Sequence, residues 1–115
     1  MRIQMIGLGP GNPEDLTLRA AEALLSGRRV MLRTERHPVA DWLQRQGVAY
    51  TSLDTLYETA EDFDALTEAS VKMLREEAEA AERAGLAPLI FAVPGHGWLE
   101  EDAAPLMAAG LEPEL

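Results

Sequence analysis

Short apolar runs alternate with amphipathic stretches along almost all of this 115-residue chain, and this alternation limits the possible folds. Strand-like apolar runs occupy residues 2–6, 30–34, 48–53 and 88–93, and the run at 48–53 is the weakest. Apolar residues at helical spacing lie between them, in residues 13–24, 38–46, 62–84 and 99–109. Strands that alternate with helices form βαβ units around a parallel sheet. The sequence therefore predicts an α/β fold, in three α/β/α layers, with a mainly parallel sheet of four to five strands.

Composition narrows the class of protein further. The chain is long enough for one small domain with a core and too short for a second complete one. It has no cysteine, no secretory signal and no apolar run of transmembrane length, so we expect a cytoplasmic protein without disulfides or membrane contact. Twenty acidic residues against ten basic ones give a net charge of −10, which repels a phosphate backbone. We therefore expect no nucleic-acid partner.

The loop GLGPGN, residues 7–12, joins the first apolar run to a helical pattern. A dinucleotide-binding turn has glycine at its first, third and sixth positions. Gly7 and Gly9 fill the first two, but Asn12 stands at the sixth, and Pro10 removes a backbone N–H that would bind a pyrophosphate. The loop is therefore a poor dinucleotide site. The residues alone leave two equal interpretations, a tight turn that needs positive φ angles or a site that binds another ligand.

Two more loops are unusual for plain connections: RTERHP at residues 33–38 and VPGHG at 93–97. Ligands of open α/β sheets bind beyond the carboxyl ends of the strands, so we expect these loops to meet the glycine loop there, with the strand at 89–93 beside that at 3–6. His96 offers a hydrogen bond to a ligand or is, like most lone histidines, a solvated loop residue. No carboxylate stands at ligand spacing beside His37 or His96, so we expect no metal site.

The predicted helix at residues 62–84 carries the acidic run EEAEAAE at 76–82. Glu76 and Glu79 share a face, but Ala80 and Arg83 follow on it, so the cluster is too small for magnesium and favours a solvated surface. Glu77 falls by spacing on the inner stripe. The other predicted members of that stripe are Phe63, Leu66, Met73, Leu74 and Ala81. The residues alone therefore predict a ligand-binding α/β domain with no visible catalytic group.

The opening IGLGPGNPEDLTLRAAEALLSG, residues 6–27, resembles that of the tetrapyrrole (corrin and porphyrin) methylase family, whose members use S-adenosylmethionine. The later stretches MLRTERHPVADWLQRQGVAYTSLDTLYE and FAVPGHGWLEE are similar to the methylase-like N-terminal domain fused to MazG-type nucleoside triphosphate pyrophosphohydrolases. The resemblance covers essentially residues 1–115. It implies the fold of the methylase N-terminal domain, with the other half of the methylase fold missing after the terminal GLEPEL, where a fifth strand would begin.

The resemblance also implies a cofactor and the residues that contact it. Because S-adenosylmethionine carries no phosphate, a full set of loop amides is not required. The family's cofactor lies in a cleft between two domains, and the matching positions here are Gly9, Pro10, Gly95, His96 and Leu99. The family's second loop normally reads Gly-Asp-Pro, whereas this chain has His96 in place of the aspartate. A neutral histidine does not replace that charge.

Two functions from different classes follow from the resemblance. The first is the cofactor-side half of an S-adenosylmethionine-dependent methyltransferase for a tetrapyrrole or another small cyclic substrate, inactive as an isolated domain because half of the cleft is missing. The second is a non-catalytic ligand-binding or regulatory module of a pyrophosphohydrolase fusion protein, which His96 favours. An uncovered ligand face also predicts a homodimer.

Overall fold

The computed structural model describes residues 2–9, 11–95 and 99–114, with the side chains of 99–103 left out. In these residues five strands form one sheet in the order β3-β2-β4-β1-β5, and every neighbouring pair is parallel. The strands are β1 (Arg2–Gly7), β2 (Val30–Leu32), β3 (Thr51–Ser52), β4 (Leu89–Val93) and β5 (Glu112–Glu114). The predicted α/β class is confirmed, and so is the neighbour relation of β1 and β4, in which Ile3 pairs with Leu89.

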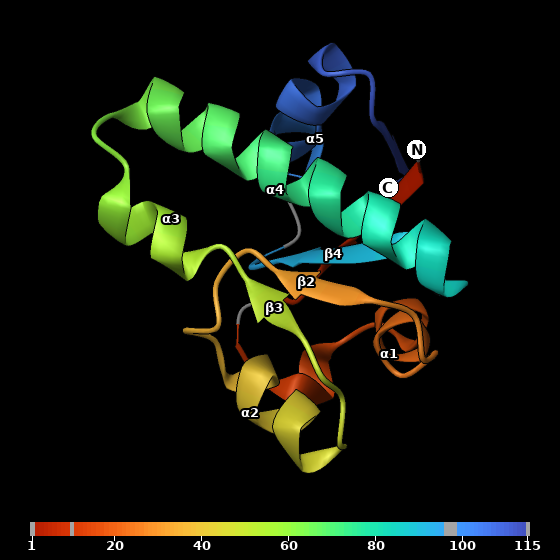
Figure 1. The fold of residues 1–115 in the computed structure, drawn as a ribbon. Helices are drawn as coiled ribbons and strands as arrows, with labels where there is room; N and C mark the ends of the chain where they lie inside the picture. Colours follow the sequence, from red (N-terminus) through yellow and green to blue (C-terminus); the bar gives the residue numbers. More distant parts are fainter. Residues whose placement is uncertain (1, 10, 96–98, 115) are drawn as a thin grey trace.

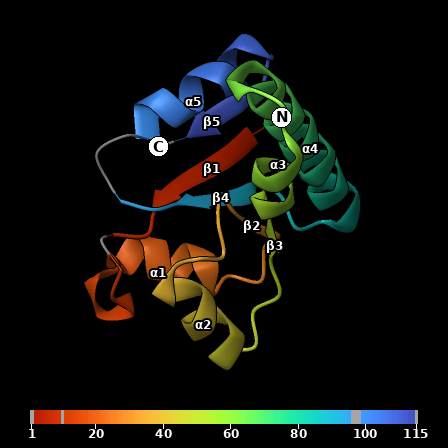
Figure 2. The same cartoon turned by 90° about the vertical axis from the view of Figure 1, so that its left-hand side faces the viewer.

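Helices cover both faces of the sheet, which confirms the predicted three layers (Figures 1 and 2). One face is covered by α1 (Leu18–Leu24), preceded by a 3-10 turn η1 (Pro13–Asp15), and by α2 (Pro38–Arg45). The other face is covered by α3 (Asp54–Thr59), α4 (Phe63–Ala84) and α5 (Leu99–Ala108). No helix in the described part of the chain is both long and apolar enough to cross a bilayer.

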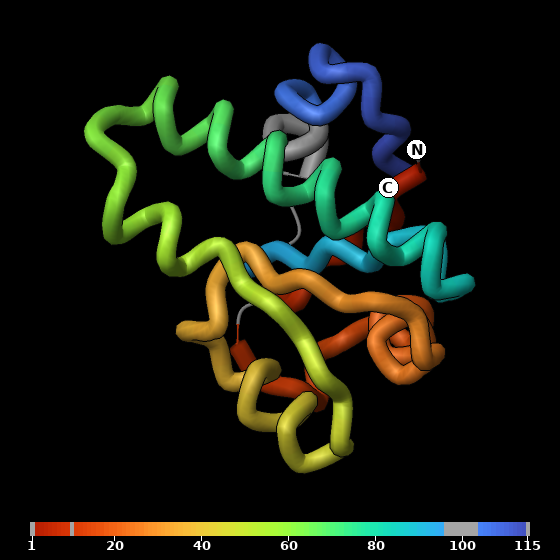
Figure 3. The backbone as a smooth tube through the Cα atoms, viewed as in Figure 1, coloured from red at the N-terminus to blue at the C-terminus, as the bar shows by residue number. Residues whose placement is uncertain are grey.

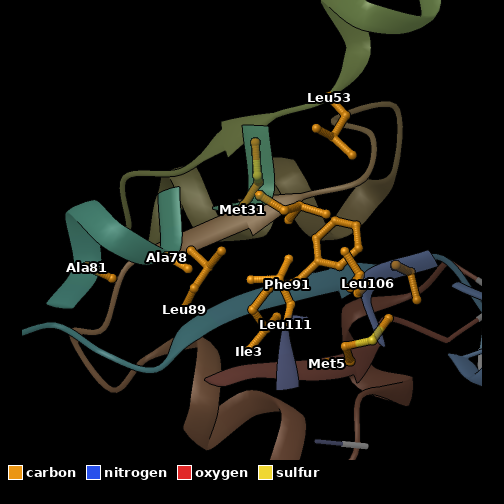
Figure 4. Packing of buried hydrophobic residues seen from close by; sticks show 12 residues of the cluster. Ile3, Met5, Met31, Leu53, Ala78, Ala81, Leu89, Phe91, Leu106 and Leu111 are labelled. Carbon is orange, nitrogen blue, oxygen red and sulfur yellow. The ribbon is translucent and has the colours of Figure 1, made fainter. Parts of the chain in front are cut away.

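Strand β4 lies at the centre of the sheet and supplies both hydrophobic cores. All five of its residues are buried, because a central parallel strand with helices on both sides has no solvent face. Leu89, Phe91 and Val93 point to the face of α4 and α5, and Ile90 and Ala92 point to the face of α1 and α2. Figure 4 shows Leu89 and Phe91 in the first of these cores, with residues from β1, β2, α4 and α5 around them.

Helix α4 has the predicted bounds for local reasons. The side chain of Asp62 accepts a hydrogen bond from the Ala65 N–H at 2.7 Å, and Gly85 ends the helix at φ 73°. Leu74 and Ala81 are buried as predicted. Phe63 was wrongly assigned to the inner stripe and is 79% exposed. The first turns of α4 extend past the ends of the strands in Figure 1, so helical spacing continues there without a sheet beneath it.

The acidic run of α4 is divided between solvent and interior. Glu76 and Glu82 are exposed, as expected for a solvated face. Glu77 lies on the inner side as predicted, and its carboxylate accepts a hydrogen bond from the Arg29 guanidinium just before β2. This hydrogen bond raises the pKa of Arg29 against the opposing effect of burial. The ion pair therefore joins α4 to the amino-terminal side of the sheet.

Helix α3 and strands β3 and β5 differ from the sequence prediction. Helix α3 was missed, and β3 is shorter than the predicted run 48–53: residues 48–50 precede the strand, and Leu53 is already the N-cap position of α3. The fifth strand, expected to begin beyond the chain, is formed by Glu112–Glu114, where Arg2 pairs with Glu112 and Gln4 with Glu114. The first and last described residues therefore lie side by side, as the red and blue ends of the tube in Figure 3 show.

Candidate functional site

The sheet reverses its winding direction between β1 and β4. These strands are neighbours, but the helix after β1, α1, packs on one face, whereas the helix after β4, α5, packs on the other. Figure 2 shows α1 and α5 on opposite sides of the pair. In open α/β sheets this arrangement leaves a crevice beyond the carboxyl ends of the two strands, and ligands bind there. The topology therefore places the candidate site at the ends of β1 and β4.

Two glycines join the loops after β1 and β4 by backbone hydrogen bonds at this position. The Leu8 N–H donates to the Val93 carbonyl at 2.8 Å, which extends the pairing of β1 and β4 by one step. Gly9 and Gly95 then form an antiparallel bridge: the Gly95 N–H donates to the Gly9 carbonyl at 3.1 Å, and the Gly9 N–H to the Gly95 carbonyl at 3.4 Å. The prediction that the loops after the first and fourth strands meet is confirmed at these residues.

The two bridging residues need to be glycine because of their backbone angles. Gly9 has φ 72° and Gly95 has φ 77°, which is the left-handed region that side chains disfavour. The positive φ angles expected of a tight turn are therefore present at both residues. A Cβ placed on Gly95 would meet no atom of the described residues within 4 Å beyond its chain neighbours. Among the described residues, this side of the main chain is therefore open.

His37 brings the loop after β2 to the same place. Its Nδ1 accepts a hydrogen bond from the Val39 N–H at 3.1 Å and so caps α2. Its Nε2 lies 3.2 Å from the Gly9 carbonyl oxygen. Because Nδ1 is the acceptor, the neutral ring carries its proton on Nε2 and donates it to Gly9. The third expected loop therefore does converge on the glycine bridge.

Asp54, at the start of α3, holds the other side of the RTERHP loop. Its carboxylate accepts hydrogen bonds from the Thr34 hydroxyl at 2.6 Å and from the Glu35 N–H at 2.8 Å. Burial acts to raise the pKa of Asp54, but these hydrogen bonds, the Ser52 hydroxyl and the nearby Arg36 charge outweigh it and lower that pKa below its ordinary value. The carboxylate is thus held in its charged form within the loop.

An open cavity of about 400 Å³ lies beside this loop. It is lined by Arg33, Thr34, Arg36, Asp54, Tyr57, Glu58 and Pro94. The Arg33 Nε donates to the Tyr57 hydroxyl at 2.9 Å, and Arg36 forms an exposed ion pair with Glu58 at 3.6 Å. Sequence reasoning missed Asp54 and Tyr57 because it missed α3. An aspartate in the first turn of a short helix after a strand was the available signal.

The structure brings together only part of the predicted cofactor set. Gly9 and Gly95 are in contact. Pro10 and His96 lie outside the described residues. Leu99 is the first residue of α5, and its side chain is not described. Among the described side chains, no three of His, Cys, Asp and Glu are grouped closely enough to hold a metal ion.

A second, larger groove of about 600 Å³ lies at the opposite end of the strands. It is bordered by Gly27 after α1, Gly47 after α2 and Leu86 before β4, which are at the amino-terminal side of the strands. Ligands of this fold class bind at the carboxyl side. The position relative to the strand ends therefore counts more than the volume of the groove. The Gly9–Gly95 bridge remains the candidate site.

These features define a doubly wound α/β chain whose switch point lies between β1 and β4. The sequence profile of the Tetrapyrrole (Corrin/Porphyrin) Methylases matches residues 2–95. The chain belongs to the tetrapyrrole methylase family, a family of S-adenosylmethionine-dependent enzymes.

Individual relatives agree with this assignment. The uncharacterized protein YabN of Bacillus subtilis (strain 168) is 27% identical over 113 residues, which cover 98% of this chain and 22% of that protein. The native form of uroporphyrin III C-methyl transferase from Thermus thermophilus superposes with a TM-score of 0.58 at 20% identity, over 99% of this chain and 47% of that one. A second structure of the Thermus thermophilus enzyme gives a TM-score of 0.57 at 22% identity. At these identities the structures show a shared fold, and this chain spans less than half the length of each of these relatives.

Proposed function

We propose that this chain is the cofactor-side half of an S-adenosylmethionine-dependent methyltransferase that acts on a tetrapyrrole or another small cyclic substrate. The observation that carries the proposal is the Gly9–Gly95 bridge at the β1–β4 switch point, open on the Gly95 side. Family membership supports the choice of cofactor. Bound S-adenosylmethionine supplies an electrophilic methyl group on its sulfonium, and this chain's own residues bind and orient the cofactor.

The proposed contacts are Gly9, Pro10, Gly95, His96 and Leu99. The fit of the site to the cofactor rests on the glycine bridge, because backbone donors and acceptors exposed by glycine can approach a ligand closely. The loop lacks the full set of amides that a pyrophosphate would use, because Pro10 has no N–H. S-Adenosylmethionine has no phosphate, so the loop chemistry supports it over a dinucleotide.

We further propose that residues 1–115 form one domain of a two-domain methylase fold. The 47% coverage of the superposed methyl transferase supports this division. Ligand sites normally bury most of their ligand, and one wall of a cleft does not. The 115 residues alone are therefore expected to bind the cofactor weakly and to show no methyl transfer.

The uncovered face also supports a homodimer, for which sedimentation velocity at high protein concentration is the test.

Isothermal calorimetry tests the cofactor assignment. S-Adenosylmethionine titrated into the chain should give saturable heat in the high micromolar to millimolar range, and ATP, as a phosphate-bearing control, should give none. Absence of binding at several millimolar S-adenosylmethionine, or stronger binding of ATP, would contradict the proposal.

His96 supports a second candidate function, a non-catalytic ligand-binding or regulatory module fused to a MazG-type pyrophosphohydrolase. The family's Gly-Asp-Pro loop has its aspartate replaced by His96 in this sequence. Loss of a charge-assisted hydrogen bond weakens binding by about ten- to a hundredfold. His96→Asp should therefore strengthen S-adenosylmethionine binding if the site retains the methylase geometry. Unchanged, negligible binding in both proteins would favour the regulatory module.

A further inference from the structure

The Gly9 carbonyl oxygen accepts two hydrogen bonds from different parts of the chain. One comes from the Gly95 N–H at 3.1 Å and the other from His37 Nε2 at 3.2 Å. A carbonyl oxygen has two lone pairs, so both are used. This carbonyl belongs to the peptide bond that leads into Pro10. Its direction is therefore fixed by the partner glycine and by a histidine 28 residues further along the chain.

His37 performs two separate tasks with its two ring nitrogens. Nδ1 caps α2 through the Val39 N–H, and Nε2 binds the Gly9 carbonyl. Histidine is not among the residues that helices prefer at this cap, and asparagine, aspartate or serine would serve at least as well. These shorter side chains would not extend to Gly9 from the same backbone position. Compared with a shorter capping side chain, the imidazole adds the hydrogen bond to Gly9.

The loop that carries His37 is held firmly on its other side. Thr34 and Glu35 are bound to the Asp54 carboxylate at 2.6 and 2.8 Å, and the Arg36 N–H donates to the Thr34 hydroxyl at 3.1 Å. His37 is therefore fixed from both directions, by the loop before it and by α2 after it. Its Nε2 can act as a fixed donor rather than as the end of a mobile side chain.

We propose that His37 is a positioning residue of the cofactor site, which holds the Gly9 carbonyl and with it the Gly9–Gly95 bridge in the binding geometry. This inference rests on the proposed function, because it assumes that the bridge borders the cofactor. His37 acts through Gly9 and is not itself assigned a contact with the ligand.

His37→Asn separates the two tasks of His37. Asparagine can cap α2 but does not replace the Nε2 donor, whereas His37→Ala removes both hydrogen bonds. Asp62→Ala serves as the matched control, because it removes the cap of α4 and lies outside the glycine bridge. For each variant, urea unfolding gives stability, calorimetry gives the affinity for S-adenosylmethionine, and hydrogen exchange gives the protection of the Gly95 amide.

Positioning of Gly9 by His37 predicts how stability, cofactor affinity and Gly95 amide exchange differ among the variants. His37→Asn should unfold at nearly the wild-type urea concentration, bind S-adenosylmethionine about three- to tenfold more weakly and exchange the Gly95 amide faster. Asp62→Ala should lose stability without losing affinity. Wild-type affinity and Gly95 protection in His37→Asn would overturn the inference while leaving the proposed function intact. If the wild-type chain binds no S-adenosylmethionine, both the proposed function and this inference fail.

Discussion

At the scale of single residues, the site depends on backbone positions more than on reactive side chains. Gly9 and Gly95 supply positive φ angles and a bridge, and His37 supplies a donor to one of the bridge carbonyls. The glycine loop was recognisable in the sequence as a turn that is unsuited to a pyrophosphate. The link from His37 was not, because Pro38 marks only a helix start, and sequence spacing does not show that the His37 ring contacts Gly9, 28 residues earlier.

Gly95→Ala should weaken cofactor binding more than its effect on stability explains. Gly47, at φ 75° and at the amino-terminal side of the strands, is a matched control, since a Cβ at either position meets no atom of the described residues within 4 Å beyond the chain neighbours. Both variants should lose about 1–2 kcal/mol of stability from the left-handed backbone, as measured by urea unfolding. Only Gly95→Ala should lose affinity in calorimetry, because its methyl group projects from the proposed cofactor side. Equal affinities of the two variants would argue against contact with Gly95.

Asp54→Asn should destabilise the chain at neutral pH. The amide keeps an acceptor for Thr34 but presents N–H groups to the Glu35 N–H, so at least one hydrogen bond is lost, at a cost of about 1–2 kcal/mol. Urea unfolding at pH 7 measures this difference. Asp15→Asn, at an exposed position of η1, is the control and should change little.

The same variant should alter the pH dependence of stability. The folded-state pKa of Asp54 lies below its ordinary value of 3.8, so the wild-type carboxylate contributes fully above that value. Its contribution is lost as the pH falls through the lowered pKa. The stability difference between wild type and Asp54→Asn should therefore shrink in acid. A difference that is constant between pH 7 and pH 3 would contradict the assigned role of the charge.

At the scale of elements, periodicity predicted the strands and helices that have an apolar side facing a core and clear end signals. Helix α4 was predicted at nearly its true bounds, since Asp62 and Gly85 mark both ends. Apolar periodicity gave wrong predictions where an element lies beyond the ends of the strands. Phe63 has helical spacing but no core beneath it, and α3 has no buried residue, so its sequence carries no apolar stripe.

Glu77→Ala should destabilise α4 packing by about 1–2 kcal/mol, because the partly buried Arg29 would lose its carboxylate partner. Glu76→Ala, an exposed neighbour in the same turn, should have almost no effect. Thermal unfolding of the two variants side by side measures the contrast. If Arg29→Met with Glu77→Met is more stable than Glu77→Ala alone, the loss comes from the unpaired arginine. Equal stability of the Glu76 and Glu77 variants would show that the ion pair contributes nothing.

At the scale of the whole molecule, the topology places the candidate site. The chain enters the sheet at β1, winds outward to β3, and returns through α4 to place β4 between β2 and β1. This return brings residues 9 and 95 together, although 85 residues separate them in sequence. The sequence predicted the neighbour relation of β1 and β4 only by assuming a shared ligand. Apolar patterning alone does not determine strand order, because every central parallel strand has a similar pattern.

The most direct test of the central claim, that S-adenosylmethionine binds at the carboxyl ends of β1 and β4, is a titration of the ¹⁵N-labelled chain followed by amide chemical shifts. Binding at this place should give saturable shifts that are largest at Gly9 and Gly95 and small at Gly27 and Gly47, on the amino-terminal side of the strands. Weak binding is sufficient for this measurement, so residues 1–115 by themselves can be used. Shifts centred on Gly27 and Gly47, or no saturable shift at millimolar cofactor, would contradict the assignment of the site.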